Sequence, residues 1–378
     1  MTSPGRQTRL DDLIRDLNLK HIPTKDVDHI RVENCIGFSK VPVGIAGPLR
    51  VSGAGLDGDI FAPLATYEPT LVASCSRGCK AFGDRGVQFE VLSEGMSRGP
   101  VFIFDDPGSA VKFAREFPAL QDQFAQWASS TSRYVRLQQT KVHVIGSQTH
   151  VYCTFYCGGA AGQNMVTKAT QFACDMLRKT YAVEFSIRDF FLEGQMASDK
   201  KPSWGNVKAA RGIEVVCWGT IENDRCQEIL GCTTQRLHHL LSTGKEGGIR
   251  NGQFGCNINT ANIIAAMFIS TGQDAGSTAE ASWSHLTSEY STETRELVMS
   301  LYIPSLPVGT VGGGTSYPTQ KEALRIVQCD GLTMKGRLAG VIACFALALD
   351  VSTSAAVATD TFTESHMKLA RGPRTAKL

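Results

Sequence analysis

The sequence predicts an α+β protein in which a small domain is inserted into a larger one. Between residues 100 and about 189 the patterns read strand, helix, hairpin and helix, the order of a ferredoxin-like split βαβ unit. The chain has 378 residues, which leaves enough sequence on both sides for a larger domain with its own core. An apolar run at 338–349 is too short to span a membrane and predicts a buried helix.

Hydrophobic periodicity and turn residues place the individual elements. Residues 9–19 have leucines at helical spacing and predict an amphipathic helix that ends before Pro23. Residues 41–55 are rich in glycine and proline and predict irregular chain with short strands. Within 66–82, Pro69 suits the first turn of a helix. The small domain is predicted to hold a strand at 100–104, a helix at 108–129, a hairpin of 134–145 with 149–155, and a helix at 162–181.

Composition is that of an ordinary soluble globular protein, with 42% hydrophobic and 20% charged residues. The net charge of +2 gives no indication of a general nucleic-acid surface. The twelve cysteines form no CxxC pair, so we expect reduced, mostly buried thiols and no metal site. The first residues hold no apolar signal core, and no segment predicts a membrane span. These features predict a cytoplasmic protein.

Four reactive side chains occur in unusual local sequences: Glu68 in "ATYEPTLVAS", Lys200 in "ASDKKPSWGN", Asp274 in "STGQDAGS" and His366 in "TESHMKLA". Each has an ordinary structural explanation as well, namely a first-turn helix charge, a surface loop, a helix cap and a surface imidazole. Lys200 and Lys201 are adjacent, and each raises the cost of charging the other. That pairing fits either a surface loop or a positive pocket for an anion, with one lysine directed at a reacting carbonyl.

Glycine-rich loops offer a second kind of site. The loop "GGAAGQNM" (158–165) follows a predicted strand and precedes a helix, an anion-binding arrangement, and "VGTVGGGT" (308–315) follows an apolar run. Neither is a GxGxxG fingerprint, so a Rossmann dehydrogenase is not supported. In "SRYVRLQ", Ser132 and Arg133 place a hydroxyl and a guanidinium near the same small domain, where they could hold a phosphate or simply form a solvated strand face.

Taken together, the ordered motifs resemble one family. "ENCIGFSKVPVGIAGPL", "LVASCSRGCKA", "GMSRGPV", "NMVTKAT", "DKKP", "GQDA" and "VGTVGGGT" follow the order and near spacing of 3-hydroxy-3-methylglutaryl-CoA reductase, class I catalytic portion. The resemblance implies a large domain with a central helix and an inserted non-Rossmann domain that binds NADPH. It also implies a homodimer or homotetramer with its active site at the subunit interface. The implied division is a helical segment at 1–31, a substrate domain at 32–99 and 190–366, an NADP-binding domain at 100–189, and a tail at 367–378.

The resemblance also implies a reaction and its residues. A 3-hydroxy-3-methylglutaryl-CoA thioester is reduced to mevalonate by two NADPH. Such chemistry needs a cation at the carbonyl oxygen, a carboxyl that protonates the aldehyde, and an acid for the CoA thiolate. Lys200, Glu68 and His366 match these roles, and Asp274 matches the carboxylate that tunes the lysine. The implied substrate residues are Arg98, Asp199, Lys201, Asn262, Ser74, Arg77 and Lys245. The implied cofactor residues are Ser132, Arg133, Gly159, Ala160, Asn164, Gly312 and Gly313.

Several positions depart from the family pattern close to this chemistry. Tyr67 and Pro69 flank the catalytic glutamate where the family has threonine and glycine, and Gly159 stands where it has aspartate. Glu193 replaces a substrate-contacting serine, and Asn259 replaces a histidine. Two alternatives therefore stay open: a reductase of a different acyl-CoA in specialised metabolism, and a non-catalytic family member.

Overall fold

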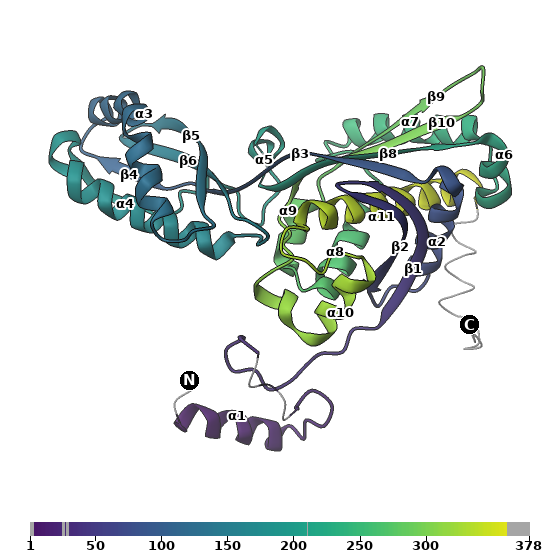
Figure 1. Cartoon of the computed structure of the whole chain (residues 1–378), viewed down its shortest axis with the longest axis horizontal. Helices are drawn as coiled ribbons and strands as arrows, with labels where there is room; N and C mark the ends of the chain where they lie inside the picture. Colours follow the sequence, from purple (N-terminus) through teal and green to yellow (C-terminus); the bar gives the residue numbers. More distant parts are fainter. Residues whose placement is uncertain (1–3, 25–26, 28–29, 210, 361–378) are drawn as a thin grey trace. The chain divides into compact units, whose positions relative to one another are not determined.

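The computed structural model describes residues 4–24, 27, 30–209 and 211–360, and it divides into two compact units, 1–43 and 44–378. The first unit holds α1 (Pro4–Asp16), so the helix predicted at 9–19 begins and ends earlier than expected. The second unit carries the remaining helices and strands of the described residues, apart from the first residue of β1. The α+β fold class is confirmed, because antiparallel sheet and helices occur together throughout this unit (Figure 1).

The main sheet of the second unit has the strand order β3-β8-β10-β9, and all three pairings are antiparallel. Its strands are β3 (Val87–Arg98), β8 (Gly212–Ile221), β9 (His285–Tyr290) and β10 (Leu297–Leu306). β1 (Val43–Gly53) and β2 (Leu56–Ala65) pair with each other, and β1 also runs parallel to β3. The prediction of irregular chain at 41–55 was therefore wrong. Pairing on both edges of β1 outweighs the low strand propensity of its glycines and proline.

The second unit contains one central helix, α11, and several shorter helices. They are α2 (Leu71–Phe82), α5 (Trp204–Lys208), α6 (Asn223–Arg225), α7 (Thr234–Arg250), α8 (Thr260–Thr271), α9 (Thr278–Ala281), α10 (Pro318–Ile326) and α11 (Lys335–Ala358). Short turns are η1 (Gly83–Arg85), η2 (Cys226–Leu230), η3 (Ala275–Ser277) and η4 (Gly313–Ser316). Figure 1 shows α11 running between the main sheet and the helices α8 and α10, and α11 contacts α2, α7, α8 and three strands. The predicted central helix is confirmed.

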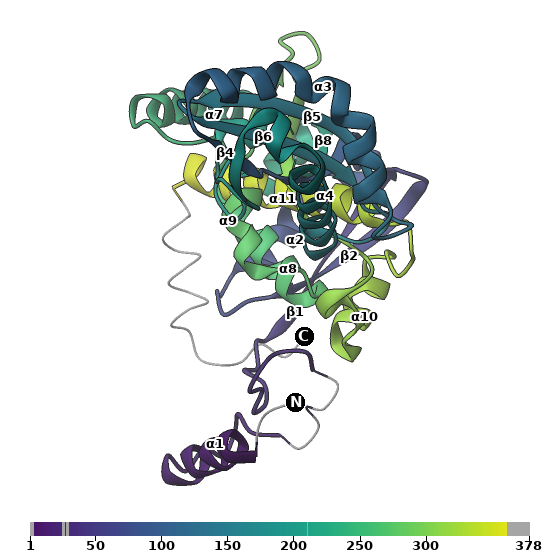
Figure 2. The ribbon, with the colours of Figure 1, turned by 90° about the vertical axis from the view of Figure 1, so that its left-hand side faces the viewer.

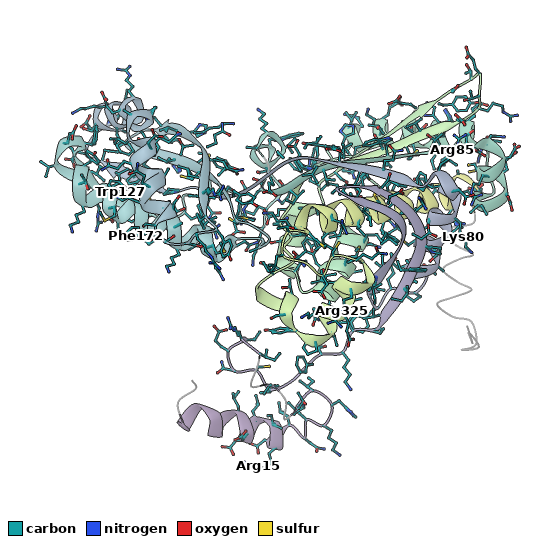
Figure 3. All side chains as sticks on the ribbon, viewed as in Figure 1. Arg15, Lys80, Arg85, Trp127, Phe172 and Arg325 are labelled. Carbon is teal, nitrogen blue, oxygen red and sulfur yellow. The ribbon has the colours of Figure 1, made fainter. Side chains whose placement is uncertain are left out.

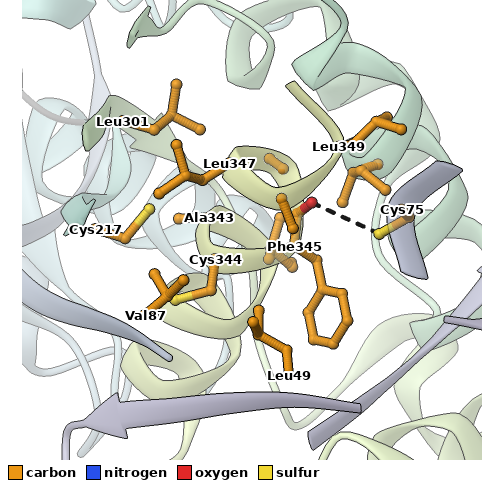
Figure 4. Packing of buried hydrophobic residues seen from close by; sticks show 14 of the residues in the cluster. Leu49, Cys75, Val87, Cys217, Leu301, Ala343, Cys344, Phe345, Leu347 and Leu349 are labelled. Atoms are coloured by element: carbon orange, nitrogen blue, oxygen red, sulfur yellow. Dashed lines mark hydrogen bonds between the residues drawn. The ribbon is translucent and has the colours of Figure 1, made fainter. Parts of the chain in front are cut away.

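α11 forms the core of the large hydrophobic cluster (Figure 4). Its side chains from Leu338 to Leu349 are at most 1% exposed. Within the described residues it alone is long and apolar enough to cross a membrane, but 94% of its most apolar stretch is buried, as in a core helix. The apolar run seen in the sequence ends at Leu349, directly before Asp350. The helix instead continues past that buried carboxylate to Ala358.

One glycine permits α2 to cross α11 closely. A Cβ placed on Gly78 would lie 1.8 Å from the carbonyl oxygen of Ala348, so the two backbones would have to separate. We expect Gly78→Ala to lower the free energy of unfolding by about 2 kcal/mol or more, the cost of overpacking a rigid core. Gly244→Ala, in α7 with nothing within 4 Å, is the control. It should raise stability by up to about 1 kcal/mol through helix propensity. Equal urea midpoints for the two variants would contradict the close-packing explanation.

The ferredoxin-like part follows β3. Its elements are β4 (Val101–Phe104), α3 (Pro107–Ser129), β5 (Arg136–Ile145), β6 (Gln148–Tyr156), α4 (Gln163–Phe185) and β7 (Ile187–Phe191). This strand-helix-strand-strand-helix-strand order is the split βαβ unit that the sequence predicts. The strand order is β7-β4-β6-β5, and β5 and β6 form the predicted hairpin. α3 and α4 pack against each other and against the sheet (Figure 2).

This part has its own hydrophobic core, in which Phe102, Phe113, Phe117 and Phe124 are fully buried. On the outer surface of α4, Phe172 is an apolar side chain that is 41% exposed (Figure 3). β3 connects the two cores, since residues 88–95 pair with β8 and residues 96–98 pair with β6. The predicted domain boundaries at 31/32, 99/100, 189/190 and 366/367 stay predictions.

Candidate active site

A cavity of about 500 Å³ lies between α2, the start of α8 and the end of α11. Four of the predicted residues line it: Glu68, Ser74, Arg77 and Asn262. Glu68 lies in the turn before α2, which begins at Leu71 because Thr70 adopts a left-handed φ of 80°. Ser74 and Arg77 are three apart on α2 and therefore share one face of the helix. Asn262 is in the first turn of α8, and its Nδ2 donates to Glu68 Oε2 at 2.7 Å.

Arg77 is held by the central helix. Its Nε donates to Ser352 Oγ at 2.9 Å and its Nη2 to the Ser352 carbonyl at 2.6 Å. The Ser74 and Ser352 hydroxyl oxygens are 2.9 Å apart. Burial lowers the pKa of the Arg77 guanidinium from its ordinary value. Sequence reasoning missed Ser352, and a serine two residues after Asp350, at the end of an apolar run, is the signal that could have indicated it.

Asp350 holds the N-terminal end of α8 in place. This fully buried carboxylate accepts hydrogen bonds from the amides of Ile258 and Asn259, at 3.3 and 2.9 Å, and from Thr260 Oγ1 at 3.2 Å. A carboxylate suits a helix N-terminus, where backbone N–H groups lack partners. Asp350 thereby positions the turn that presents Asn262 to Glu68. The departure at Asn259 is accommodated here, because its Nδ2 donates to Thr353 Oγ1 at 3.0 Å.

Asp350 also carries a pH dependence. Burial raises its pKa to about 6, and its three hydrogen bonds oppose this only in part. The folded state holds this proton more tightly than the unfolded chain does. The stabilisation that the protonated Asp350 contributes to the free energy of unfolding is therefore fully present below about pH 4 and is lost as pH rises through about 6. We expect the wild type to lose about 3 kcal/mol relative to Asp350→Asn between these limits. Urea unfolding of both proteins from pH 4 to pH 7 measures the difference, and parallel curves would contradict it.

The second group of predicted residues surrounds Lys200. Lys200 Nζ forms an ion pair with Asp274 Oδ2 at 3.0 Å, and the two side chains are 49% and 38% exposed. Asp274 also caps η3 by accepting from the Gly276 amide at 3.0 Å. Lys200 has a left-handed φ of 59°, a conformation that non-glycine residues rarely adopt outside functional loops. The ion pair brings together two of the four predicted catalytic side chains.

Asp199 and Arg98 are bonded within the chain. Asp199 Oδ1 accepts from Arg211 at 2.7 Å and Oδ2 from Arg98 at 3.2 Å. Arg98 also donates to Thr167 Oγ1 at 2.8 Å. Lys201 is exposed, with its Nζ 3.1 Å from the Asp199 carbonyl oxygen. The role of these residues as substrate ligands stays a prediction, and neither Arg211 nor its other partner was singled out from the sequence.

Glu193, the departure nearest to Lys200 in sequence, is directed onto its own loop. Its Oε2 accepts from the Gly99 amide at 3.1 Å and its Oε1 from the Ala197 amide at 3.4 Å. These bonds tie the start of the loop to the end of β3. The carboxylate is therefore occupied by backbone donors.

Most of α8 separates the Glu68–Asn262 cluster from the Lys200–Asp274 pair. Asn262 is in the first turn of α8, and Asp274 lies three residues beyond its last residue, Thr271. The intervening nine residues of helix are about 14 Å long. Lys245, on α7, lines a further cavity of about 490 Å³ that shares Ile258 and Val357 with the first. His366 lies outside the described residues.

The predicted cofactor residues gather where two loops meet. The Gly159 carbonyl accepts from the Thr310 amide at 2.9 Å, which joins the loop after β6 to the loop that contains Gly312 and Gly313. A Cβ on Gly159 would lie 1.7 Å from the Leu332 carbonyl oxygen, whereas nothing lies within 4 Å of one on Gly312 or Gly313. The departure from aspartate at Gly159 thus has a steric reason.

The other predicted cofactor residues lie in the loop after β6, in α4 and in the turn before β5. Ala160 lies beside Gly309, and Asn164 is exposed in the first turn of α4. Ser132 and Arg133 lie in the turn before β5. There the Ser132 hydroxyl accepts from the Tyr134 amide at 3.3 Å, and the Arg133 guanidinium lies 4.7 Å from the Tyr134 ring centre. A small open loop, a helix N-terminus and a guanidinium together fit a phosphate-bearing dinucleotide.

Comparison with known proteins decides the family. The model of the hydroxymethylglutaryl-coenzyme A reductase family matches residues 6–371. The chain belongs to this family. As a family member it is an oxidoreductase, and the resemblance seen in its motifs is confirmed. The class I label stays a prediction.

The reductase resembles relatives from two domains of life. It is 35% identical to the 3-hydroxy-3-methylglutaryl-coenzyme A reductase of Aeropyrum pernix, over 90% of this chain and 82% of that one. It is 34% identical to reductase 1 of Arabidopsis thaliana, over 90% of this chain and 58% of that one. Among solved structures, a class II reductase from Streptococcus pneumoniae bound to NADPH aligns with a TM-score of 0.71 at 18% identity, covering 97% and 90% of the two chains. That likeness concerns the fold.

Proposed function

We propose that this reductase converts 3-hydroxy-3-methylglutaryl-CoA to mevalonate and free CoA, using two molecules of NADPH. The observation that carries the proposal is the Lys200–Asp274 ion pair, 3.0 Å long, on the "DKKP" and "GQDA" motifs of a confirmed family member. Each hydride, together with one proton, reduces the substrate by two electrons. The thioester thus becomes a hemithioacetal, then an aldehyde and CoA thiol, and finally a primary alcohol.

NADPH supplies both hydrides, and the residues of this chain supply the remaining chemistry. The Lys200 ammonium stabilises the negative charge that develops on the carbonyl oxygen in each reduction. Glu68, oriented by Asn262 at 2.7 Å, protonates the aldehyde oxygen. Asp274 holds the Lys200 ammonium in place, and His366 protonates the CoA thiolate as it leaves.

The substrate side of the site is the cavity lined by α2, α8 and α11. Ser74 and Arg77 face the CoA portion there, and Lys245 pairs with the terminal carboxylate of the acyl group from the adjoining cavity. The Glu193 carboxylate is directed onto two backbone amides of its own loop, which supports the usual substrate over a changed one. We propose that the protein acts in the cytoplasm.

The complete active site contains residues from two copies of the chain. About 14 Å of α8 separates the ends at which the Glu68 and Lys200 groups lie, and both groups must reach one carbonyl. A second copy related by a two-fold axis supplies the missing half of each site. The assembly is therefore a homodimer or a tetramer built from such dimers.

Consumption of reduced nicotinamide with 3-hydroxy-3-methylglutaryl-CoA tests the proposed reaction. We expect two NADPH oxidised per mevalonate formed, with mevalonate identified by mass spectrometry. No turnover by folded protein that still binds NADPH would contradict the substrate assignment, and a panel of other acyl-CoA thioesters would then identify the substrate. Failure to bind either NADPH or CoA would instead favour the non-catalytic alternative.

A further inference from the structure

The Arg211 guanidinium is completely buried, with no exposed surface. It lies directly before β8. Its Nη1 donates to both carboxylate oxygens of Glu280, at 2.6 and 2.7 Å, and its Nη2 donates to Asp199 Oδ1 at 2.7 Å. Glu280 is itself only 1% exposed. One guanidinium thus connects two acidic side chains that are far apart in the sequence.

Both acceptors adjoin the catalytic pair. Asp199 directly precedes Lys200. Glu280 is on α9, which follows η3 without a break, and η3 is the turn that Asp274 caps. Arg211 therefore cross-links the segment that carries Lys200 to the segment that carries Asp274. The 3.0 Å distance between the Lys200 and Asp274 side chains depends on the relative position of these two segments.

The Lys200 segment requires such support because its backbone is strained. Gln195, Ser198 and Lys200 have left-handed φ values of 66°, 52° and 59°. Each such residue costs on the order of 1 kcal/mol and persists only where surrounding contacts hold it. Other contacts also hold the loop, among them the Glu193 bonds to backbone amides, the Arg98 bond to Asp199, and the bond from the Gly194 amide to the Gly99 carbonyl oxygen. Arg211 differs from these in that it also reaches the Asp274 side, through Glu280.

Stability alone does not account for this arrangement. Replacing a buried ion pair by apolar side chains of similar size is often neutral or stabilising, since two charges must be removed from water. What a rigid guanidinium provides that apolar packing does not is a fixed geometry between two carboxylates. We propose that Arg211 is a positioning residue that sets the Lys200–Asp274 ion pair. Its catalytic consequence rests on the proposed function, whereas its structural consequence does not.

Lysine labelling tests the structural consequence without any need for turnover. In the wild type, brief acetylation followed by mass spectrometry should modify Lys200 several-fold more slowly than Lys201, because the Lys200 ammonium is bonded to Asp274. The double variant Arg211→Met with Glu280→Met removes the cross-link while filling its volume. There the Lys200 rate should rise to that of Lys201, as in the positive control Asp274→Asn. Arg178→Met, which removes an exposed arginine paired with Asp189, should leave the rates unchanged.

Kinetics then test the catalytic consequence. For the double variant we expect kcat to fall about 100-fold, the effect of a misplacement of about 1 Å, while the KM for NADPH stays unchanged. Arg211→Lys should give an intermediate kcat, since one ammonium lacks the fork that spans both carboxylates. If the double variant does not fold, Glu280→Gln replaces it, because glutamine keeps the shape of the side chain and one acceptor. The Lys200 labelling rate should again rise and kcat should again fall. A folded variant whose Lys200 labels at the wild-type rate overturns the inference. A wild type without turnover overturns the proposed function alone.

Discussion

Lys200→Met loses at least about 99.9% of the reductase turnover while keeping the fold. Methionine has nearly the length of lysine but no charge, so it removes the cation that stabilises the developing oxyanion and little else. Loss of one preorganised oxyanion contact costs about 10²–10³-fold in rate, and a full positive charge at two successive reductions belongs at or beyond the upper end of that range. The measurement is kcat for NADPH oxidation with saturating 3-hydroxy-3-methylglutaryl-CoA.

The neighbouring lysine provides the matched control. Lys201→Met removes the same charge one residue later, where the ammonium donates to the Asp199 carbonyl oxygen. We expect it to raise the KM for the thioester and to leave most of kcat. Both variants should unfold within about 1 kcal/mol of the wild type, because exposed charges contribute little to stability. Near-normal turnover by Lys200→Met, or equal loss in both variants, would remove Lys200 from its role.

Mixing two inactive variants restores activity. Glu68→Gln and Lys200→Met each remove one half of every active site. If each site takes Glu68 from one chain and Lys200 from the other, a mixed dimer contains one site with both defects and one intact site. Random mixing makes half of all dimers mixed, so about a quarter of the wild-type activity should return.

Co-expression of the two variants with different affinity tags, followed by two-step purification of the mixed dimer, makes this measurement direct. The mixed dimer should then show about half of the wild-type kcat. The control is Glu68→Gln paired with Asn262→Asp, because both changes fall in the same half of the site and should not complement. Absence of recovery in purified mixed dimers would show that one chain supplies both Glu68 and Lys200.

Local patterns predicted the ferredoxin-like part well, because α3, the β5–β6 hairpin and α4 each have a clear period and clear ends. β1 was predicted only as irregular chain with short strands, since its glycines and proline are held in one long strand by pairing with β2 and β3. Asp350 appeared to end an apolar run, although tertiary hydrogen bonds allow the carboxylate to stay buried within α11. Tertiary pairing is not encoded in local periodicity.

The same distinction applies to the site. The ordered motifs identified Glu68, Asn262, Lys200 and Asp274, and the structure pairs them as two contacts. The motifs gave no indication of Ser352, Arg211 or Glu280, because each acts through another side chain rather than on a substrate. The negative charge at Glu193 looked unfavourable in sequence, and only its bonds to two backbone amides explain how it is accommodated.

The close approach of the chain at Leu332 to Gly159 restricts which residues can stand at position 159. Because the Leu332 carbonyl oxygen occupies the space that a Cβ would need, any relative with an aspartate at this position must carry a differently placed chain near residue 332. The two segments, more than 150 residues apart, should therefore change together during evolution. A transplant of the family's aspartate into this reductase should succeed only when the 329–334 segment of the donor is transplanted with it.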